Sequence, residues 1–235
     1  MNKNILEKAV VFCALGILIF LGAYSNFAEQ QQIEETKIPE TIEFNEYFQR
    51  WLTNHKNKNI PIEADQFRLY EENEVYNTGR LTIYPISDQL HFDSYKSELE
   101  KYRDIKDARF SPNGEQVVDF RNEIRNGIST REFAPYELLY LGKRKDRIIE
   151  NKLLRCSLKD LCYIDRAYFV DDDTVVASTF TLDSGSNPRL PTTCDYTKKC
   201  PYIVSVYVIN IATNSAKVYH SPPIELILSN KIDGF

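Results

Sequence analysis

The sequence predicts a mainly β domain that follows short helices and one N-terminal hydrophobic helix. Short apolar runs separated by tight turns fill the chain from Lys106 onward, a pattern typical of antiparallel strands. Two segments of this part contain four predicted strands in the same order. An uncharged apolar run covers residues 9–24. The composition, 43% hydrophobic and 27% charged, is that of a globular chain.

The charge balance argues against nucleic acid as a partner. The 235 residues include 29 Lys and Arg against 34 Asp and Glu, so the formal net charge is −5. Proteins that bind nucleic acids usually carry a clustered basic face instead. The chain length predicts one foldable domain with a small N-terminal appendage.

The N-terminus predicts export. Lys3 and Lys8 precede the apolar run against Glu7 alone, which is the layout of an export signal. The run is long for a cleaved signal and slightly short for a membrane span, so residues 1–25 are either a signal peptide or a membrane anchor. In both cases the rest of the chain is extracytoplasmic, whether secreted, periplasmic or anchored to the membrane through this segment.

Cysteine spacing supports export independently. Apart from Cys13, the cysteines form two pairs with five residues between the members, Cys156 with Cys162 and Cys194 with Cys200. An even count at a repeated spacing in an exported chain predicts disulfides. Three connectivities are open, and two local bridges need the least assembly. A four-thiolate zinc site is the alternative, but its paired ligands are usually two to four residues apart.

Three further regions precede the strand-rich part. Residues 26–42 are polar and rich in Gln and Glu, which predicts a stalk or linker. Residues 43–105 are expected to be an α/β part of the exported domain. Within it, an amphipathic helix with one aromatic face is predicted over Glu43–His55 by side chains at three- and four-residue intervals, namely Phe44, Tyr47, Phe48, Trp51 and Leu52. Charge spacing predicts a surface helix over Asp93–Tyr102.

A hairpin is expected between these helices. Gln66–Tyr70 and Arg80–Ile86 are strand candidates, and the turn signal Asn77-Thr78-Gly79 separates them.

The segment 106–235 contains the repeated unit. The first copy has strands near Ala108–Phe110, Gln116–Arg121, Tyr136–Leu141 and Arg147–Glu150. The second copy has strands near Arg166–Phe169, Thr174–Thr181, Ile203–Ile211 and Ala216–His220. Aligning Phe110 with Phe169 gives an offset of 59 residues, and the longer loops explain why this exceeds the roughly 40–50 residues of common blade repeats.

Two stretches resemble a known repeat family. The run Ala108–Phe120, ARFSPNGEQVVDF, is similar to the F-S-P-D-G turn and following strand of the WD40-like repeats in TolB-type β-propellers. The run Val206–Val218, VYVINIATNSAKV, is similar to the strand–turn–strand that closes such blades. The resemblance covers residues 106–221 and implies an interaction scaffold. Asp171–Asp173 replaces the Ser-Pro-Asn-Gly turn in the second copy, and Asn214 stands where the family usually has Gly.

The resemblance implies two or three four-stranded antiparallel blades, the hairpin region being a degenerate third. A closed propeller typically needs four or more blades, so an incomplete or open propeller is expected. Either the remaining sheet is divergent, or two blades stack as an open sandwich covered by the N-terminal helices. We favour the second arrangement.

Catalytic and cofactor motifs were not found. The three histidines are scattered, and no cofactor is predicted. Asp171–Asp173 with Asp183 could supply oxygen ligands to Ca²⁺, although their spacing matches no EF-hand loop. The most function-like segment is the loop Leu182–Pro201, because long loops in compact β domains commonly carry binding. Its candidate binding residues are Arg189, Tyr196, Lys198 and Lys199.

The sequence is compatible with three functions. The leading hypothesis is an exported, non-catalytic binding or scaffold domain of the cell envelope with a protein or glycan partner. The first alternative is an envelope hydrolase with its site near Asp171–Asp173 and Asp183. The second is a structural envelope protein that assembles through exposed strand edges.

Overall fold

The computed structural model describes residues 46–73, 81–105, 108–120, 137–156, 161–185 and 193–231. All of them belong to one compact unit, Thr41–Phe235. The expected hydrophobic helix, the signal or anchor of residues 1–25 and the linker of residues 26–42 lie outside the described residues.

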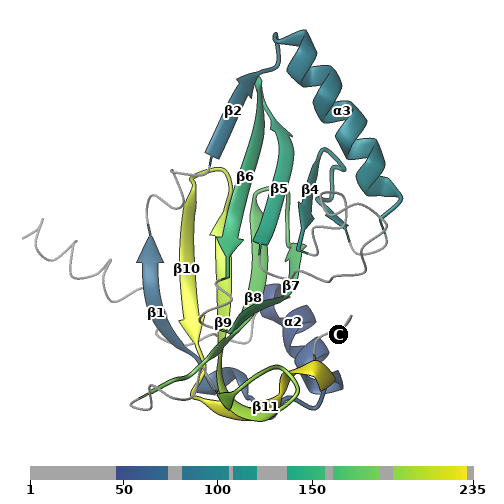
Figure 1. Ribbon diagram of the computed structural model, residues 1–235. Coiled ribbons are helices and arrows are strands. Elements are labelled where there is room, and N and C mark those ends of the chain that lie inside the picture. The colour runs from purple at the N-terminus through teal and green to yellow at the C-terminus, as the bar shows by residue number, and fades with distance from the viewer. Residues whose placement is uncertain are drawn as a thin grey trace, which may run out of the picture. The chain divides into compact units, whose positions relative to one another are not determined.

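The strands form two antiparallel sheets (Figure 1), which confirms the mainly β prediction. The first sheet has the order β2 (Leu81–Pro85), β6 (Arg147–Arg155), β5 (Glu137–Arg144), β4 (Gln116–Asp119) and β3 (Arg109–Phe110). The second has the order β1 (Arg68–Asn73), β10 (Ser215–His220), β9 (Lys199–Asn210), β8 (Thr174–Leu182) and β7 (Cys162–Phe169). Strand β11 (Ile224–Ile227) pairs with the first residues of β9.

Each sheet contains one of the two expected four-stranded units. Strands β3 to β6 are neighbours in sequence order, and so are β7 to β10. The registers of the two meanders correspond. One row of paired residues runs through Phe110, Val117, Leu141 and Glu150. The equivalent row in the second sheet runs through Phe169, Val175, Ile209 and Ala216.

The hairpin prediction was wrong. Strands form near both predicted segments, but β1 pairs with β10 and β2 pairs with β6. Each strand therefore extends the outer edge of a different meander. A local turn signal does not fix the partners of the strands beside it, and here each strand forms five residue pairs with an existing sheet edge. The turn Asn77-Thr78-Gly79 lies outside the described residues.

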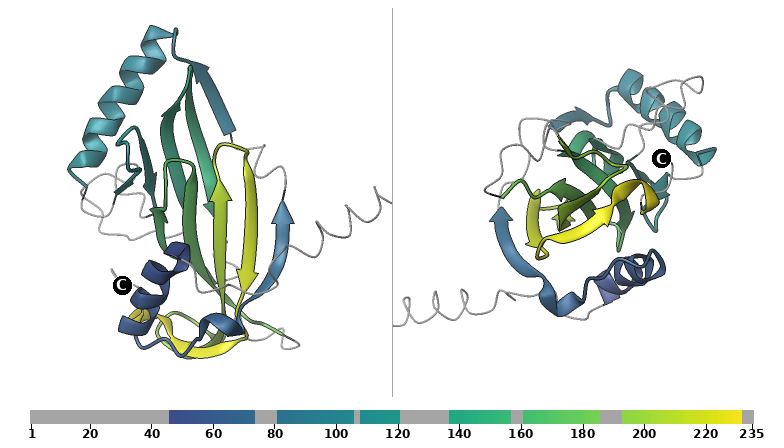
Figure 2. Two further views of the ribbon diagram at one scale, coloured as in Figure 1. Left: turned by 180° about the vertical axis from the view of Figure 1, so that it is seen from behind. Right: turned by 60° about the horizontal axis from the view of Figure 1, so that its bottom comes forward.

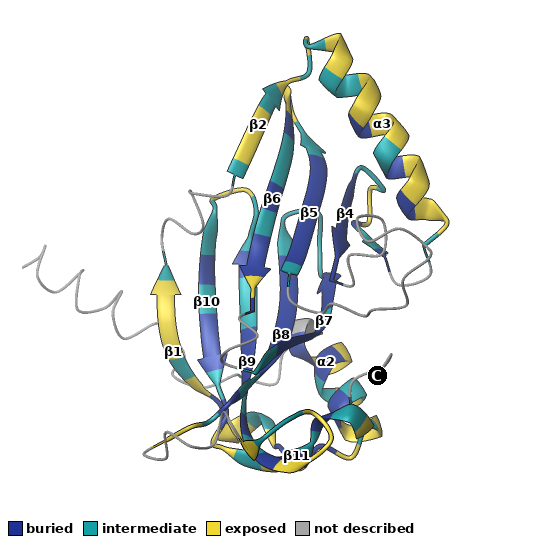
Figure 3. Ribbon diagram, viewed as in Figure 1, coloured by how far each residue is buried: buried dark blue, intermediate teal, exposed yellow. Residues whose placement is uncertain are grey.

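The sheets pack face to face, and each outer face is covered by a helix (Figures 1 and 2). The cluster between them joins side chains of β4, β5 and β6 to side chains of β7 through β10. Helix α3 (Gln89–Arg103) covers the outer face of the first sheet, and α2 (Glu46–Asn57) covers that of the second. Figure 3 shows the inner strands buried and the edge strands β1 and β2 largely exposed.

Helix α3 starts one turn before the predicted Asp93. The Asp88 side chain accepts a hydrogen bond from His91 N at 3.3 Å and caps the helix. The helix is more than a surface helix, because Tyr95, Leu99 and Tyr102 are buried against the first sheet.

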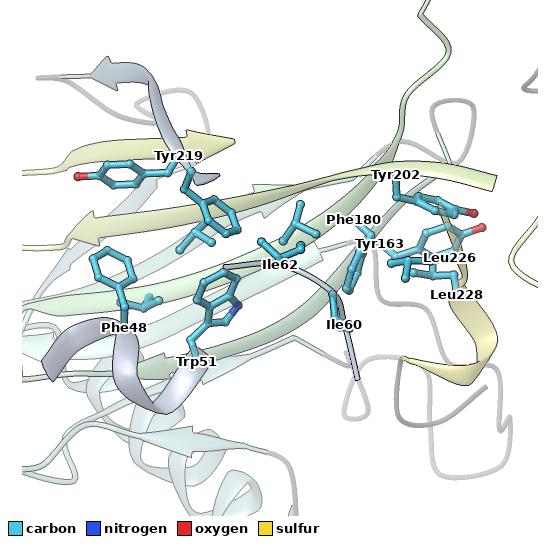
Figure 4. Close-up of a cluster of buried hydrophobic side chains, with 14 of the residues drawn as sticks. Phe48, Trp51, Ile60, Ile62, Tyr163, Phe180, Tyr202, Tyr219, Leu226 and Leu228 are labelled. Carbon is cyan, nitrogen blue, oxygen red and sulfur yellow. The ribbon is translucent and has the colours of Figure 1, made fainter. Parts of the chain in front are cut away.

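Helix α2 anchors the largest core cluster (Figure 4). Its predicted aromatic face is present, since Phe48 and Trp51 are buried against the second sheet. The Trp51 ring meets Phe67 edge-on, with 5.1 Å between ring centroids. Two short 3-10 helices, η1 (Ala64–Gln66) and η4 (Leu228–Asn230), complete the described elements.

His55 lies in the last turn of α2 with 2% of its surface exposed. Its Nδ1 is 3.3 Å from Trp51 O, and its Nε2 has no hydrogen-bond partner among the described residues. Burial lowers the pKa of His55 to about 4, because the imidazolium would lose its hydration. Asp165 opposes this shift, whereas Lys58 and Arg166 add to it.

We expect acid to destabilise the fold through His55. The unfolded chain binds a proton near pH 6.5 and the native state only near pH 4, so stability falls as pH drops through this window and the loss is complete below it. The expected loss is about 3 kcal/mol. Urea denaturation at a series of pH values measures it. In His55→Phe the dependence between pH 6.5 and pH 4 should be reduced; an unchanged dependence would exclude His55 as its source.

Candidate binding site

Both predicted disulfides are present. Cys156 at the end of β6 bonds to Cys162 at the start of β7, with Cα atoms 5.0 Å apart. Cys194 bonds to Cys200 in β9, with Cα atoms 6.1 Å apart. The two bridges are consistent with an extracellular or periplasmic protein.

The second bridge closes a small loop, residues 194–200, which we call the Cys194–Cys200 ring. Its backbone is held at several points. The Asp195 carboxylate accepts a hydrogen bond from Thr197 N at 2.8 Å, and Asp195 O accepts one from Lys198 N at 3.2 Å. From outside the ring, Ser229 N donates a hydrogen bond to Tyr196 O at 2.8 Å. The ring therefore has a fixed conformation.

The ring is also anchored to the core. Cys200 is buried, and Cys194 packs against the cluster under α2. Strand β11 pairs with residues 199–202, where the ring continues into β9. Leu226 of β11 belongs to the same cluster. Hydrogen bonds from Thr197 lower the pKa of Asp195, so its carboxylate stays ionised while it holds the turn.

The ring brings together three of the four predicted binding residues. Tyr196 is 41% exposed, one of four large hydrophobic side chains that are exposed in the described part of the chain. Lys199 is exposed at the start of β9. The Lys198 ammonium turns back onto the ring and contacts Thr193 O at 2.9 Å and Asp195 Oδ2 at 3.2 Å. Arg189 lies outside the described residues.

The acidic turn Asp171–Asp173 connects the two sheets. Asp172 Oδ1 accepts a hydrogen bond from Asn113 N at 2.9 Å, and Asp172 O accepts one from Gln116 Nε2 at 2.7 Å. Asp173 pairs with Arg144 at 2.6 Å. Asn113 and Asp172 are 59 residues apart, the offset of the repeat, so equivalent turns of the two units contact each other.

Asp183 does not join this turn. Asp183 follows β8, whereas Asp171–Asp173 precede β8. The two ends of this nine-residue strand are roughly 30 Å apart. The calcium ligand set and the hydrolase site suggested from the sequence are therefore not assembled from these four acids. No three His, Cys, Asp or Glu side chains gather as metal ligands within the described ranges.

Sequence reasoning missed the support of the ring, namely β11, η4 and Ser229. The segment after Pro223 is short, and its strand is not among those expected from the sequence. Its signal was the alternation of Ile224, Leu226 and Leu228, which are the three residues of this segment that pack against the core.

Comparisons with known protein families, curated proteins and solved structures gave no match. Of the helices in the described ranges, none is both long and apolar enough to cross a membrane.

Proposed function

We propose that the protein is an exported, β-rich binding or scaffold domain of the cell envelope that recognises a protein or glycan partner through the Cys194–Cys200 ring. The observation that carries this proposal is an exposed aromatic side chain, Tyr196, on a loop whose conformation is already fixed. Tyrosine is one of the residues enriched at binding hot spots. Lys199, three residues further along the same disulfide-closed loop, is exposed as well and adds a cation to this surface.

The fixed loop matters because binding normally loses conformational entropy. Ordering a flexible side chain or loop on binding opposes association by about 0.5–1.5 kcal/mol per side chain. The disulfide, the Asp195 turn and the Ser229 hydrogen bond have already removed much of this freedom. Tyr196 can therefore contribute its contact area with little further ordering.

We further propose that the two meanders are related to propeller blades. The row containing Val117 and Leu141 faces α3, whereas the equivalent row containing Val175 and Ile209 faces the first sheet. Equivalent faces thus point in the same direction, as they do in successive blades of a propeller. On this proposal α2 and α3 stand in for the missing neighbouring blades, and the domain is a scaffold.

Alanine at position 196 should weaken partner binding without loss of stability. The purified full chain in detergent is immobilised, and solubilised envelope proteins and cell-wall glycan fragments are passed over it. Because hot-spot truncations lose about 2 kcal/mol, we expect Tyr196→Ala to reduce the affinity for the captured partner by at least tenfold. The melting temperature should change little, since the hydrogen bond from Ser229 N is accepted by the Tyr196 backbone O, which alanine keeps.

The matched control is Tyr70→Ala. Tyr70 is 67% exposed on β1 and stacks on His220, in a different part of the second sheet. Its replacement should leave the affinity unchanged. Equal losses in both variants, or none in either, would reject the ring as the binding site.

A further inference from the structure

Strand β2 is an edge strand with features that differ from those of the other edges. The sheet orders end in β2 and β3 in the first sheet and in β1 and β7 in the second. Strand β1 carries Glu71 and Glu72 and a bulge at Tyr70, and β7 carries a bulge and two charged residues. Strand β3 is two residues long. Charges, bulges, prolines and shortness are the usual means by which proteins protect an edge from pairing. Of these, β2 has only a proline, Pro85, at its last position.

None of the charges or bulges is present in β2. Its sequence, LTIYP, is uncharged and rich in residues that favour strands, and its five pairs with β6 run without a register shift. Ile83 at its centre is 44% exposed. Within the described ranges, no other strand pairs with the free side of β2.

The register shows which backbone groups point away from the sheet. Ile86 N donates to Asp146 O at 2.8 Å, in register with the β2–β6 ladder. Hydrogen-bonding residues alternate along an antiparallel strand, so Thr82 and Tyr84 face β6. Leu81, Ile83 and Pro85 then present their backbone groups outward, and Pro85 offers only its carbonyl.

We infer that β2 pairs with β2 of a second copy of this chain, antiparallel and centred on Ile83. The pattern of outward groups is self-complementary in this register. The two Ile83 residues exchange both of their hydrogen bonds, and each Leu81 N–H reaches the carbonyl of the other copy's Pro85. The missing N–H of Pro85 leaves only the Leu81 carbonyls to solvent. Both exposed Ile83 side chains become cross-strand neighbours.

The contact does not bring like charges together, because β2 has none. A pair of five-residue strands buries less than the roughly 1,200–2,000 Å² of a stable interface, so we expect a weak, reversible dimer. The inference is independent of the binding proposed for the Cys194–Cys200 ring, since it uses a different sheet and a different test.

Cysteine cross-linking can trap such a dimer. In the full chain with Cys13→Ser, Ile83→Cys places two thiols opposite each other, where Cα atoms of a hydrogen-bonded pair are about 5.5 Å apart and a disulfide can form. Thr82→Cys is the matched control, because Thr82 is equally an exposed β2 residue but lies opposite the other copy's Tyr84 in this register. Both proteins are oxidised in their native membranes and analysed on non-reducing gels.

The expected result is a band of twice the monomer mass for Ile83→Cys in several-fold excess over Thr82→Cys. Sedimentation of the detergent-solubilised wild-type chain should show a mass that increases with concentration. A second variant, Ile83→Lys, should abolish this increase, because it places two ammonium groups on the dimer axis. The absence of an Ile83→Cys dimer, or equal dimer in both cysteine variants, would overturn the inference.

Discussion

Replacing Trp51 with alanine should lower the free energy of unfolding by about 3–5 kcal/mol. Trp51 is 1% exposed, and its ring contacts Phe67 and His55 in the cluster that attaches α2 to the second sheet. Truncation removes apolar contact area and leaves a cavity that neighbouring strands cannot collapse to fill. Denaturant titration with an unchanged m value is the appropriate measurement.

Two further variants make this expectation specific. Gln49→Ala, on the exposed side of the same helix, should stay within about 0.5 kcal/mol of the wild type. Trp51→Phe should lose much less than Trp51→Ala, because it keeps a ring and removes an indole N–H that has no acceptor within the described residues. Wild-type stability in Trp51→Ala would mean that α2 is not part of the core.

Lys58→Met should destabilise the fold by about 3–5 kcal/mol. Lys58 Nζ lies 2.9 Å from Asp165 Oδ1, and the Asp165 side chain is fully buried. The variant leaves this carboxylate in the core without its ammonium partner, and the hydrogen bond from Ser178 Oγ at 3.3 Å does not replace that charge. Chemical denaturation at pH 7 measures the loss.

The double variant Lys58→Met with Asp165→Leu separates this effect from lost packing. If the loss arises from an uncompensated buried charge, the double variant is more stable than Lys58→Met alone. If the loss of stability in the double variant equals the sum of the losses in Lys58→Met and Asp165→Leu, the two residues are not a coupled buried ion pair.

Local patterns were sufficient to predict much of the fold. The strand order of both meanders follows from alternating apolar residues and from turns such as Ser111–Gly114, because these signals act over a few residues. The aromatic face of α2 was predicted from the spacing of Phe48 and Trp51 for the same reason. That the four cysteines form disulfides followed from their equal spacing in a chain that was expected to be exported, whereas the choice of the two local bridges is visible only in the structure.

Long-range choices could not be predicted in this way. The partners of β1 and β2 depend on which sheet edges are available after the meanders have formed, and the turn between them carries no information about those edges. Likewise, the sequence suggests Asp171–Asp173 as metal ligands, but Asp172 holds the turn of the first unit, Asp173 pairs with Arg144 and Asp171 accepts hydrogen bonds within its own turn. The support of Tyr196 by Ser229 joins residues 33 positions apart.

The proposed site can be tested most directly in living cells. A photoreactive phenylalanine analogue replaces Tyr196 in the full chain, and in a second strain it replaces Tyr70, the other strongly exposed tyrosine in the described part of the chain. We predict a covalent adduct with one envelope component on irradiation at position 196 and none at position 70. Addition of Lys199→Glu should reduce that adduct strongly, since it reverses an exposed charge within the Cys194–Cys200 ring. No adduct at position 196, or the same adducts at both positions, would contradict binding through the Cys194–Cys200 ring.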